Sequence, residues 1–252
     1  MSGENPFETP TVAETPEGSL LEQLKGGPLG VLELYGLAIR LLVDRIQVVA
    51  PLALLFILVR ALSALLGNIW IASVLGFLLG ALRSTANAEL VRAALAGRPI
   101  SFAEALSRGL ANAPRFVALT LACLLLTLLG LIALVIPGLV AYVAFVFAPY
   151  AALFGLPAKE ALRTSAKLSA AHVGTTLLLV VTTDVLPLAL SGGPWLMSGL
   201  GLPPLVFQIT DVLNLLLSFI TTTAVVLAYQ HFTLSAAAAG PSASAGPAPA
   251  SS

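Results

Sequence analysis

Apolar stretches that match the thickness of a bilayer recur along this chain, and they constrain its fold more than any other feature. The clearest covers residues 116–135 and contains no charged side chain. A helix rises 1.5 Å per residue, so about 20 residues cross a hydrocarbon core of about 30 Å. Only 10% of the 252 residues are charged, whereas soluble domains carry about 25%. The stretches also lack the period-two alternation of a membrane barrel. The sequence therefore predicts an all-α polytopic membrane protein.

Six apolar stretches organise the chain. We expect membrane spans at residues 46–66, 68–90, 116–135, 139–156, 173–190 and 205–229. Residues 1–28 are rich in Glu, Pro, Thr and Gly and lack a periodic apolar face, which predicts a disordered acidic tail. Residues 235–252 are almost wholly Ala, Gly, Pro and Ser and predict a second disordered tail. The membrane domain is therefore expected at residues 29–234.

Basic residues collect in every second connection between the expected spans. These connections, with the stretch before the first span, hold Lys25, Arg40, Arg45, Arg92, Arg98, Arg108, Arg115, Lys159, Arg163 and Lys167. Lys and Arg in short loops mark the cytoplasmic side of a membrane. We therefore expect both termini to be cytoplasmic and three short hairpin turns to lie on the opposite side.

The basic connections also contain amphipathic segments that share a pattern. Ser101 is placed to cap a helix, with Glu104 three residues later as its capping-box partner. The triplet Glu-Ala-Leu occurs at residues 104–106 and again at 160–162, each time after a Gly-x-Pro, and a fainter copy begins at Glu33. This repeat predicts three hairpins of two spans, each preceded by an amphipathic helix. Such a helix either lies in the membrane interface or forms the end of a tilted span.

Three short motifs resemble those of a known group of proteins. They are Ile136-Pro137-Gly138, Phe147-Ala148-Pro149 and Glu160-Ala161-Leu162 with Ser165. Together they are similar to the signature of six-helix prokaryotic membrane proteins, including YciC-like proteins and the membrane domain of some glycerophosphodiester phosphodiesterases. The resemblance implies a six-helix domain in the bacterial inner membrane and carries little information on function. Because this sequence shows no soluble region of hydrolase size, the resemblance does not imply phosphodiesterase activity.

Charged residues inside three apolar stretches are the candidate functional site. If the spans cross in the predicted order, Arg60, Asp184 and Asp211 lie at similar depth in the outer half of the bilayer. An isolated charge at the centre of a membrane helix costs at least about 2.5–3.5 kcal/mol, so we expect Arg60 to bond one or both carboxylates. The cluster is either a proton or substrate site or an ion pair that fixes helix packing.

Further polar and small residues extend these predictions. Gln208 and Asn214 share a helical stripe with Asp211, which either lines a polar cavity or bonds to other helices. Gly76 and Gly80 have a spacing that permits close helix contact, within the chain or with a second copy. Structural roles are also expected for Pro137 and Gly138, as a tight turn, and for Pro149, as a kink.

No catalytic motif is recognisable in the sequence. The two histidines do not occur in a zinc-binding motif, and neither a phosphate-binding loop nor a nucleophile elbow is present. We therefore expect no enzymatic activity and no cofactor, and the zero net charge does not indicate nucleic-acid binding. The favoured hypothesis is an accessory or scaffold protein that contacts membrane lipids and a protein partner or a second copy. The alternative is a small transporter or channel that uses the Arg60, Asp184 and Asp211 cluster.

Overall fold

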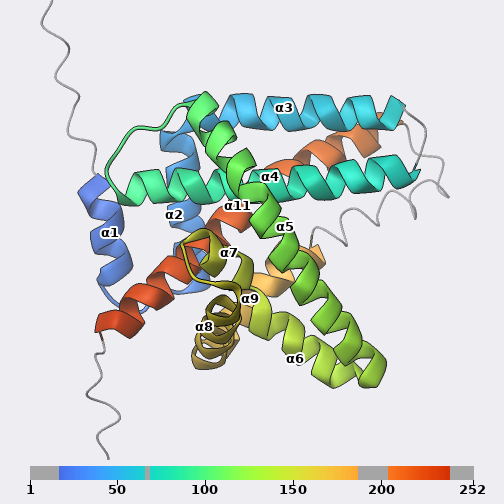
Figure 1. Cartoon of the computed structure of the whole chain (residues 1–252). Helices are drawn as coiled ribbons and strands as arrows, with labels where there is room; N and C mark the ends of the chain where they lie inside the picture. The colour runs from blue at the N-terminus through green and yellow to red at the C-terminus, as the bar shows by residue number, and fades with distance from the viewer. Residues whose placement is uncertain (1–16, 66–68, 187–203, 239–252) are drawn as a thin grey trace, which may run out of the picture.

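The computed structural model of the protein describes residues 17–65, 69–186 and 204–238, and these residues form helices joined by short turns (Figure 1). The helices are α1 (Glu17–Lys25), α2 (Val31–Asp44), α3 (Ile46–Leu65), α4 (Ile69–Leu95), α5 (Phe102–Ala133), α6 (Val135–Phe145), α7 (Ala148–Leu153), α8 (Ala158–Ala171), α9 (Val173–Val180), the π-helical η1 (Val181–Val185) and α11 (Pro204–Ala238). The all-α prediction is confirmed.

Several of these helices are long and apolar enough to cross a membrane. Four candidate spans lie at Ser73–Leu95, Phe102–Ala133, Val135–Leu153 and Val212–Ala238. Two bent helix pairs, α2 with α3 and α8 with α9, raise the number to six if each pair is one span. The chain is therefore compatible with a polytopic membrane protein, as its composition predicts.

The amphipathic segments differ among the three repeats. In the first repeat α2 meets α3 at 92°, and in the third α8 meets α9 at 106°. These steep bends are what an interfacial helix before a span requires. The second repeat is different, because α5 is one helix of 32 residues, about 48 Å long at 1.5 Å per residue. Its first half lies along α4, where a Cβ on Gly109 would come within 3.1 Å of the Ala86 backbone nitrogen. The prediction of a separate amphipathic helix is therefore wrong for this repeat.

The repeat is visible in two turns that have the same hydrogen bonds. Gly97 and Gly155 both have positive φ, at 62° and 106°. The N–H of Gly97 donates to the Ala94 carbonyl, and the next residue donates to Ala93. The N–H of Gly155 donates to the Ala152 carbonyl, and the next residue to Ala151. This is the Schellman arrangement, in which glycine removes the steric cost of left-handed backbone.

Helix α11 runs through the middle of the fold (Figure 1), where it packs against α2, α3, α4 and α7 among others. Residues 224–228 of this helix are buried on every side, which explains why the run contains only Ala, Val and Leu. Phe147, Tyr229 and Phe232 form an aromatic cluster beside them, with the rings of Phe147 and Phe232 edge to face at 5.7 Å. The described C-terminal end of α11 includes residues 235–238, which the sequence assigned to a disordered tail.

The N-terminal segment is attached to α11 through His231, which is 3% exposed. The ring accepts a hydrogen bond from the Leu29 N–H at 3.3 Å through Nε2. Its Nδ1 lies 2.7 Å from the Leu24 carbonyl oxygen, so the neutral ring with hydrogen on Nδ1 satisfies both contacts. Leu24 belongs to α1 and is fully buried. The predicted tail at residues 1–28 is therefore wrong for residues 17–25, because apolar residues there pack into the core.

Helices α5 and α6 form a hairpin whose turn is one residue long. Leu134 alone has extended backbone, with φ −165° and ψ 145°, and α6 begins at Val135. Pro137 and Gly138 therefore lie inside the first turn of α6, and the prediction that they form the turn is wrong. Proline is accepted there because an N–H in the first helical turn has no partner to lose. The packing role of Gly138 is supported, since a Cβ on Gly130 would lie 2.8 Å from the Gly138 Cα.

Gly76 and Gly80 make no close contact with the described residues. A Cβ on either glycine would find no atom within 4 Å. Nearby side chains on α4 are exposed, with Trp70 at 79% and Val74 at 59%. Of the two alternatives, a contact within the chain is not seen among the described residues, and a contact with a second copy stays a prediction. The close contact of α4 is instead at Ala86, against Gly109 of α5.

The end of α3, the start of α4 and the α5–α6 turn lie on one side of the fold, at a distance from the basic connections (Figure 1). In Figure 1 the end of α3, the start of α4 and the turn between α5 and α6 lie on the right, whereas α1, α2 and the α4–α5 connection lie on the left. The apolar half of the α5–α6 hairpin also diverges from α3 and α4 in this view. The fold therefore has a compact basic end and an apolar end with separated hairpins.

Candidate functional site

Of the three charges predicted to cluster, the structure describes the side chain of Asp184 only. Asp184 lies in η1, where Tyr142 of α6 donates a hydrogen bond to its Oδ2 at 2.6 Å. The side chains of Arg60, Asp211 and Gln208 lie outside the described residues, so the predicted pairing with Arg60 stays a prediction. Asn214 is on α11 and partly buried. The polar partner that the structure gives Asp184 is therefore a tyrosine that the sequence did not single out.

The helix around Asp184 is irregular. Residues Val181–Val185 form a π-helix, a rare geometry that often occurs at functional sites. Thr182 donates from Oγ1 to the carbonyl oxygens of Leu178 and Leu179, at 2.9 and 3.1 Å. The same hydroxyl is bonded to the Tyr35 hydroxyl of α2. Tyr35 and Tyr142 therefore approach η1 from two helices, at Thr182 and Asp184.

Two further polar groups connect this region to α4. Tyr150 of α7 is buried near Asp184, Arg83 and Ser84. The Arg83 guanidinium carbon lies 6.0 Å from the centre of the Phe219 ring on α11. Arg83, Tyr150 and Asp184 therefore lie in one polar region, which we call the tyrosine site together with Tyr142 and Tyr35.

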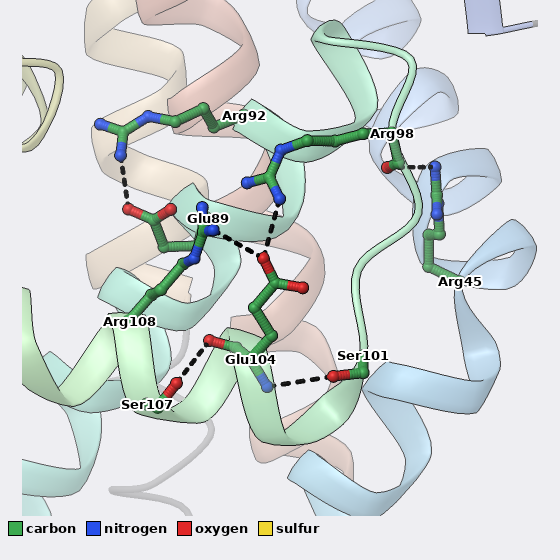
Figure 2. A network of polar contacts seen from close by, with 8 residues as sticks. All are labelled: Arg45, Glu89, Arg92, Arg98, Ser101, Glu104, Ser107 and Arg108. Atoms are coloured by element: carbon green, nitrogen blue, oxygen red, sulfur yellow. Dashed lines mark hydrogen bonds and ion pairs between the residues drawn. The ribbon is translucent and has the colours of Figure 1, made fainter.

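A second polar site lies at the basic end of the fold and is centred on Glu89 of α4 (Figure 2). Glu89 is 2% exposed. Its Oε1 accepts bonds from Arg92 at 2.6 Å and from Asn112 of α5 at 3.1 Å. Arg92 also donates to the Leu153 carbonyl of α7 and lies 4.9 Å from the Phe154 ring centre. Glu89 and Arg92 therefore connect α4, α5 and α7.

Glu104 forms ion pairs with two arginines on the adjacent surface (Figure 2). Its Oε1 lies 2.8 Å from Arg98 and 2.8 Å from Arg108. Its backbone N–H donates to the Ser101 hydroxyl at 3.2 Å, which confirms the predicted helix cap. Arg45 completes this network by donating to the Arg98 carbonyl at 3.4 Å. The α4–α5 connection is thus held to α5 by ion pairs and to the end of α2 by the Arg45 hydrogen bond.

The break between α6 and α7 is closed by Ser165 of α8. The Ser165 hydroxyl donates to the Ala144 carbonyl at 2.7 Å and accepts a bond from the Phe147 N–H at 3.1 Å. Pro149 is the second residue of α7 and cannot donate a backbone bond to the end of α6. A break at Pro149 matches its predicted role as a kink. Ser165 then supplies the bonds that the backbone cannot make.

Several of these polar contacts join different helices. Asn112 bonds to Glu89 between α5 and α4, Tyr142 bonds to Asp184 between α6 and η1, and Ser165 of α8 bonds to the α6–α7 break. Among the described residues, no group of three His, Cys, Asp or Glu side chains is arranged to hold a metal ion. Sequence reasoning missed Tyr35, Tyr142 and the burial of Glu89. The sequence does mark η1 in one way, because three consecutive polar residues interrupt an apolar stretch there: Thr182, Thr183 and Asp184.

Comparisons with known proteins give no further identification. No family model, no curated protein and no solved structure matches this chain.

Proposed function

We propose that this protein is a non-enzymatic accessory or scaffold protein of the bacterial inner membrane, which contacts lipid and holds a second membrane protein or a second copy through the α5–α6 hairpin. The observation that carries the proposal is the exposure of this hairpin. Leu125, Leu129 and Ile132 on α5 are 60%, 63% and 82% exposed, and Ile136 on α6 is 75% exposed. Only 22% of the most apolar stretch of α5 is buried inside the fold, against 56% of the corresponding stretch of α11.

The two helices of the exposed hairpin nevertheless pack closely against each other. Gly130 and Gly138 bring its two helices into close contact, and α6 begins directly after Leu134. Lipid tails are as apolar as leucine, so burial from water does not drive such a hairpin onto its own bundle. Association in a membrane depends on surface fit and polar bonds. A closed hairpin that diverges from the other helices therefore offers two free faces to another membrane segment.

The described polar groups support a structural role rather than catalysis. Glu89, Glu104 and Ser165 each bond to groups on neighbouring helices, as the distances above show. Those bonds fix α4, α5, α7 and α8 as the base from which the hairpin extends. The basic residues near this base favour a cytoplasmic location for it, because Lys and Arg are retained on that side during insertion.

Site-specific cross-linking tests the scaffold proposal. The chain has one cysteine, Cys123, and replacing it with alanine gives a background for Leu129→Cys on α5. The matched control is Leu58→Cys on α3, since Leu58 is 64% exposed. With a short thiol-linked photo-cross-linker in native membranes, Leu129→Cys is expected to give one adduct of defined mass and Leu58→Cys none. Absence of an adduct, or equal adducts at both positions, would refute the proposal.

A second function, ion or proton transport, is favoured by one observation. The π-helix η1 holds Asp184 beside Tyr142. An ionisable group within an apolar span is energetically costly, and such groups usually serve a function. In reconstituted vesicles that contain a pH-sensitive dye, transport predicts proton flux above that of protein-free vesicles, with loss of flux in Asp184→Asn. Flux equal to that of empty vesicles removes this alternative.

A further inference from the structure

Most cations of the second repeat are held in ion pairs, whereas those of the third repeat are not, among the described residues. At the start of α5, Arg108 and the preceding Arg98 both bind Glu104. Arg92, just before them in sequence, binds Glu89. All three arginines are therefore held in ion pairs, although three arginines and two glutamates leave a net charge of +1. The corresponding helix of the third repeat is α8, and its basic residues have a different environment.

Helix α8 carries Lys159, Arg163 and Lys167 at intervals of four residues, so the three side chains form one ridge along the helix. All three are exposed. None of them has an ion-pair partner within the part of the chain that the structure describes. Glu160 is the one acidic residue of α8 and is also exposed. The surface of α8 therefore carries a net charge of about +2.

The opposite face of α8 is fixed to the rest of the fold. Ala161, Ser165, Leu168 and Ser169 are buried, and Ser165 bonds to the backbone of the α6–α7 break. The ridge therefore has a defined position that does not depend on a ligand. It also has a defined direction, because α8 meets the following span at 106°.

A helix that is nearly perpendicular to a span at the span's end lies close to the membrane plane. Cations on such a helix are at the level of the lipid headgroups, where each interacts with anionic lipid. We propose that Lys159, Arg163 and Lys167 bind the phosphates of anionic phospholipid headgroups in the leaflet at the basic end of the fold. This inference rests on the proposed membrane role and names its lipid partner.

Binding of a short-chain phospholipid to the purified full-length protein tests the inference. The probe is dioctanoyl-phosphatidylglycerol, with dioctanoyl-phosphatidylcholine and inorganic phosphate as comparisons. The test variant is K159Q/R163Q/K167Q. The control K25Q/R40Q/R108Q removes the same amount of charge from exposed residues outside α8. A third variant, K159R/K167R, keeps the charge of the ridge.

The anionic lipid is expected to bind the test variant at least tenfold more weakly than the unmodified protein. The control and the K159R/K167R variant are expected to stay within twofold, and phosphatidylcholine binding is expected to be unchanged. Equal losses in the test and control variants would show a general charge effect and overturn the inference. Equal competition by inorganic phosphate would assign the ridge to a free anion instead of a lipid. The Leu129→Cys adduct is read separately, so its presence in the test variant distinguishes failure here from failure of the scaffold role.

Discussion

Ser165 bonds to Phe147 across the break between α6 and α7, with its hydroxyl accepting the Phe147 N–H at 3.1 Å while donating to the Ala144 carbonyl at 2.7 Å. Pro149 lacks the N–H that would bond to the Phe145 carbonyl, and Ser165 bonds to two other backbone groups of the same break. The two residues belong to separate sequence motifs, Phe147-Ala148-Pro149 and Glu160-Ala161-Leu162 with Ser165. The hydrogen bonds of Ser165 show that both motifs contribute to the same helix break.

Replacing Ser165 with alanine is expected to destabilise the fold. The change leaves the buried Phe147 N–H without its partner and the Ala144 carbonyl with only the 3.4 Å bond from Ser169. An unsatisfied buried group of this kind costs about 1–3 kcal/mol. Thermal unfolding in detergent should show a lower midpoint for Ser165→Ala. The matched control is Ser107→Ala, because Ser107 is exposed and bonds only to its own helix, at the Glu104 carbonyl. A midpoint shift equal to the control would contradict the role assigned to Ser165.

Removal of Arg92 should be more harmful than removal of Arg108. Arg92→Ala leaves Glu89 buried and charged without its cation, a loss of about 3–5 kcal/mol for a fully buried pair. The loss is expected at the lower end of this range, because the Arg92 side chain is 36% exposed. Arg108 is 47% exposed, and Arg108→Ala should cost about 1 kcal/mol or less. Unfolding midpoints of the two variants measure the difference, and equal midpoints would argue against a structural role for Glu89.

The hairpin glycines are expected to differ from those of α4. Gly138→Leu forces α5 and α6 apart, because even a Cβ at this position would collide with Leu131. Gly76→Ala should be neutral or stabilising by about 0.5–1 kcal/mol, since alanine favours the helix and the site has free space. Distances between spin labels at Cys123 and a cysteine introduced at Val140 report whether the hairpin opens. An unchanged distance in Gly138→Leu would show that close packing at the glycine is not required.

Acidification is expected to lower stability through His172. Burial lowers the pKa of His172 below its usual value, and the nearby His231 lowers it further. In the unfolded chain this side chain takes up a proton near pH 6.5, at a higher pH than in the folded protein. Stability is therefore retained above about pH 6.5 and falls as the pH drops through the unfolded pKa toward the lower folded pKa.

The control for this pH effect uses the ring contact of His172. Its imidazole stacks on Phe232, with centroids 3.9 Å apart. His172→Phe keeps an aromatic ring there but removes the titration. The difference in unfolding midpoint between pH 7.5 and pH 5.5 should be smaller in this variant than in the unmodified protein. A difference of the same size would assign the pH dependence to other groups.

Local patterns predicted the parts of the fold that depend on neighbouring residues. The Ser101 cap is confirmed because the two groups that form it lie three residues apart. The repeated Gly-x-Pro motifs each begin with a glycine that forms a turn. The predicted turn at Pro137 and Gly138 failed because proline suits both a turn and the first turn of a helix, and the sequence alone does not choose between them. Leu134, which makes the turn, carries no local signal.

The candidate sites were harder to predict because their partners are distant in sequence. Asp184 and Tyr142 are separated by 42 positions, and Glu89 and Asn112 by 23. A charge in an apolar run indicates that a partner is needed without identifying it. The burial of Glu89 was missed for the same reason, since a glutamate near a helix end is usually exposed unless another helix covers it.

The turn at Leu134 also affects how this protein enters a membrane. The hairpin from Phe116 to Phe145 contains no charged residue, and its tip is a single leucine. A hairpin with this tip moves no hydrophilic loop across the hydrocarbon, so it avoids the main energetic barrier to translocation. The two helices can therefore insert together as one closed element from the side on which the chain is made.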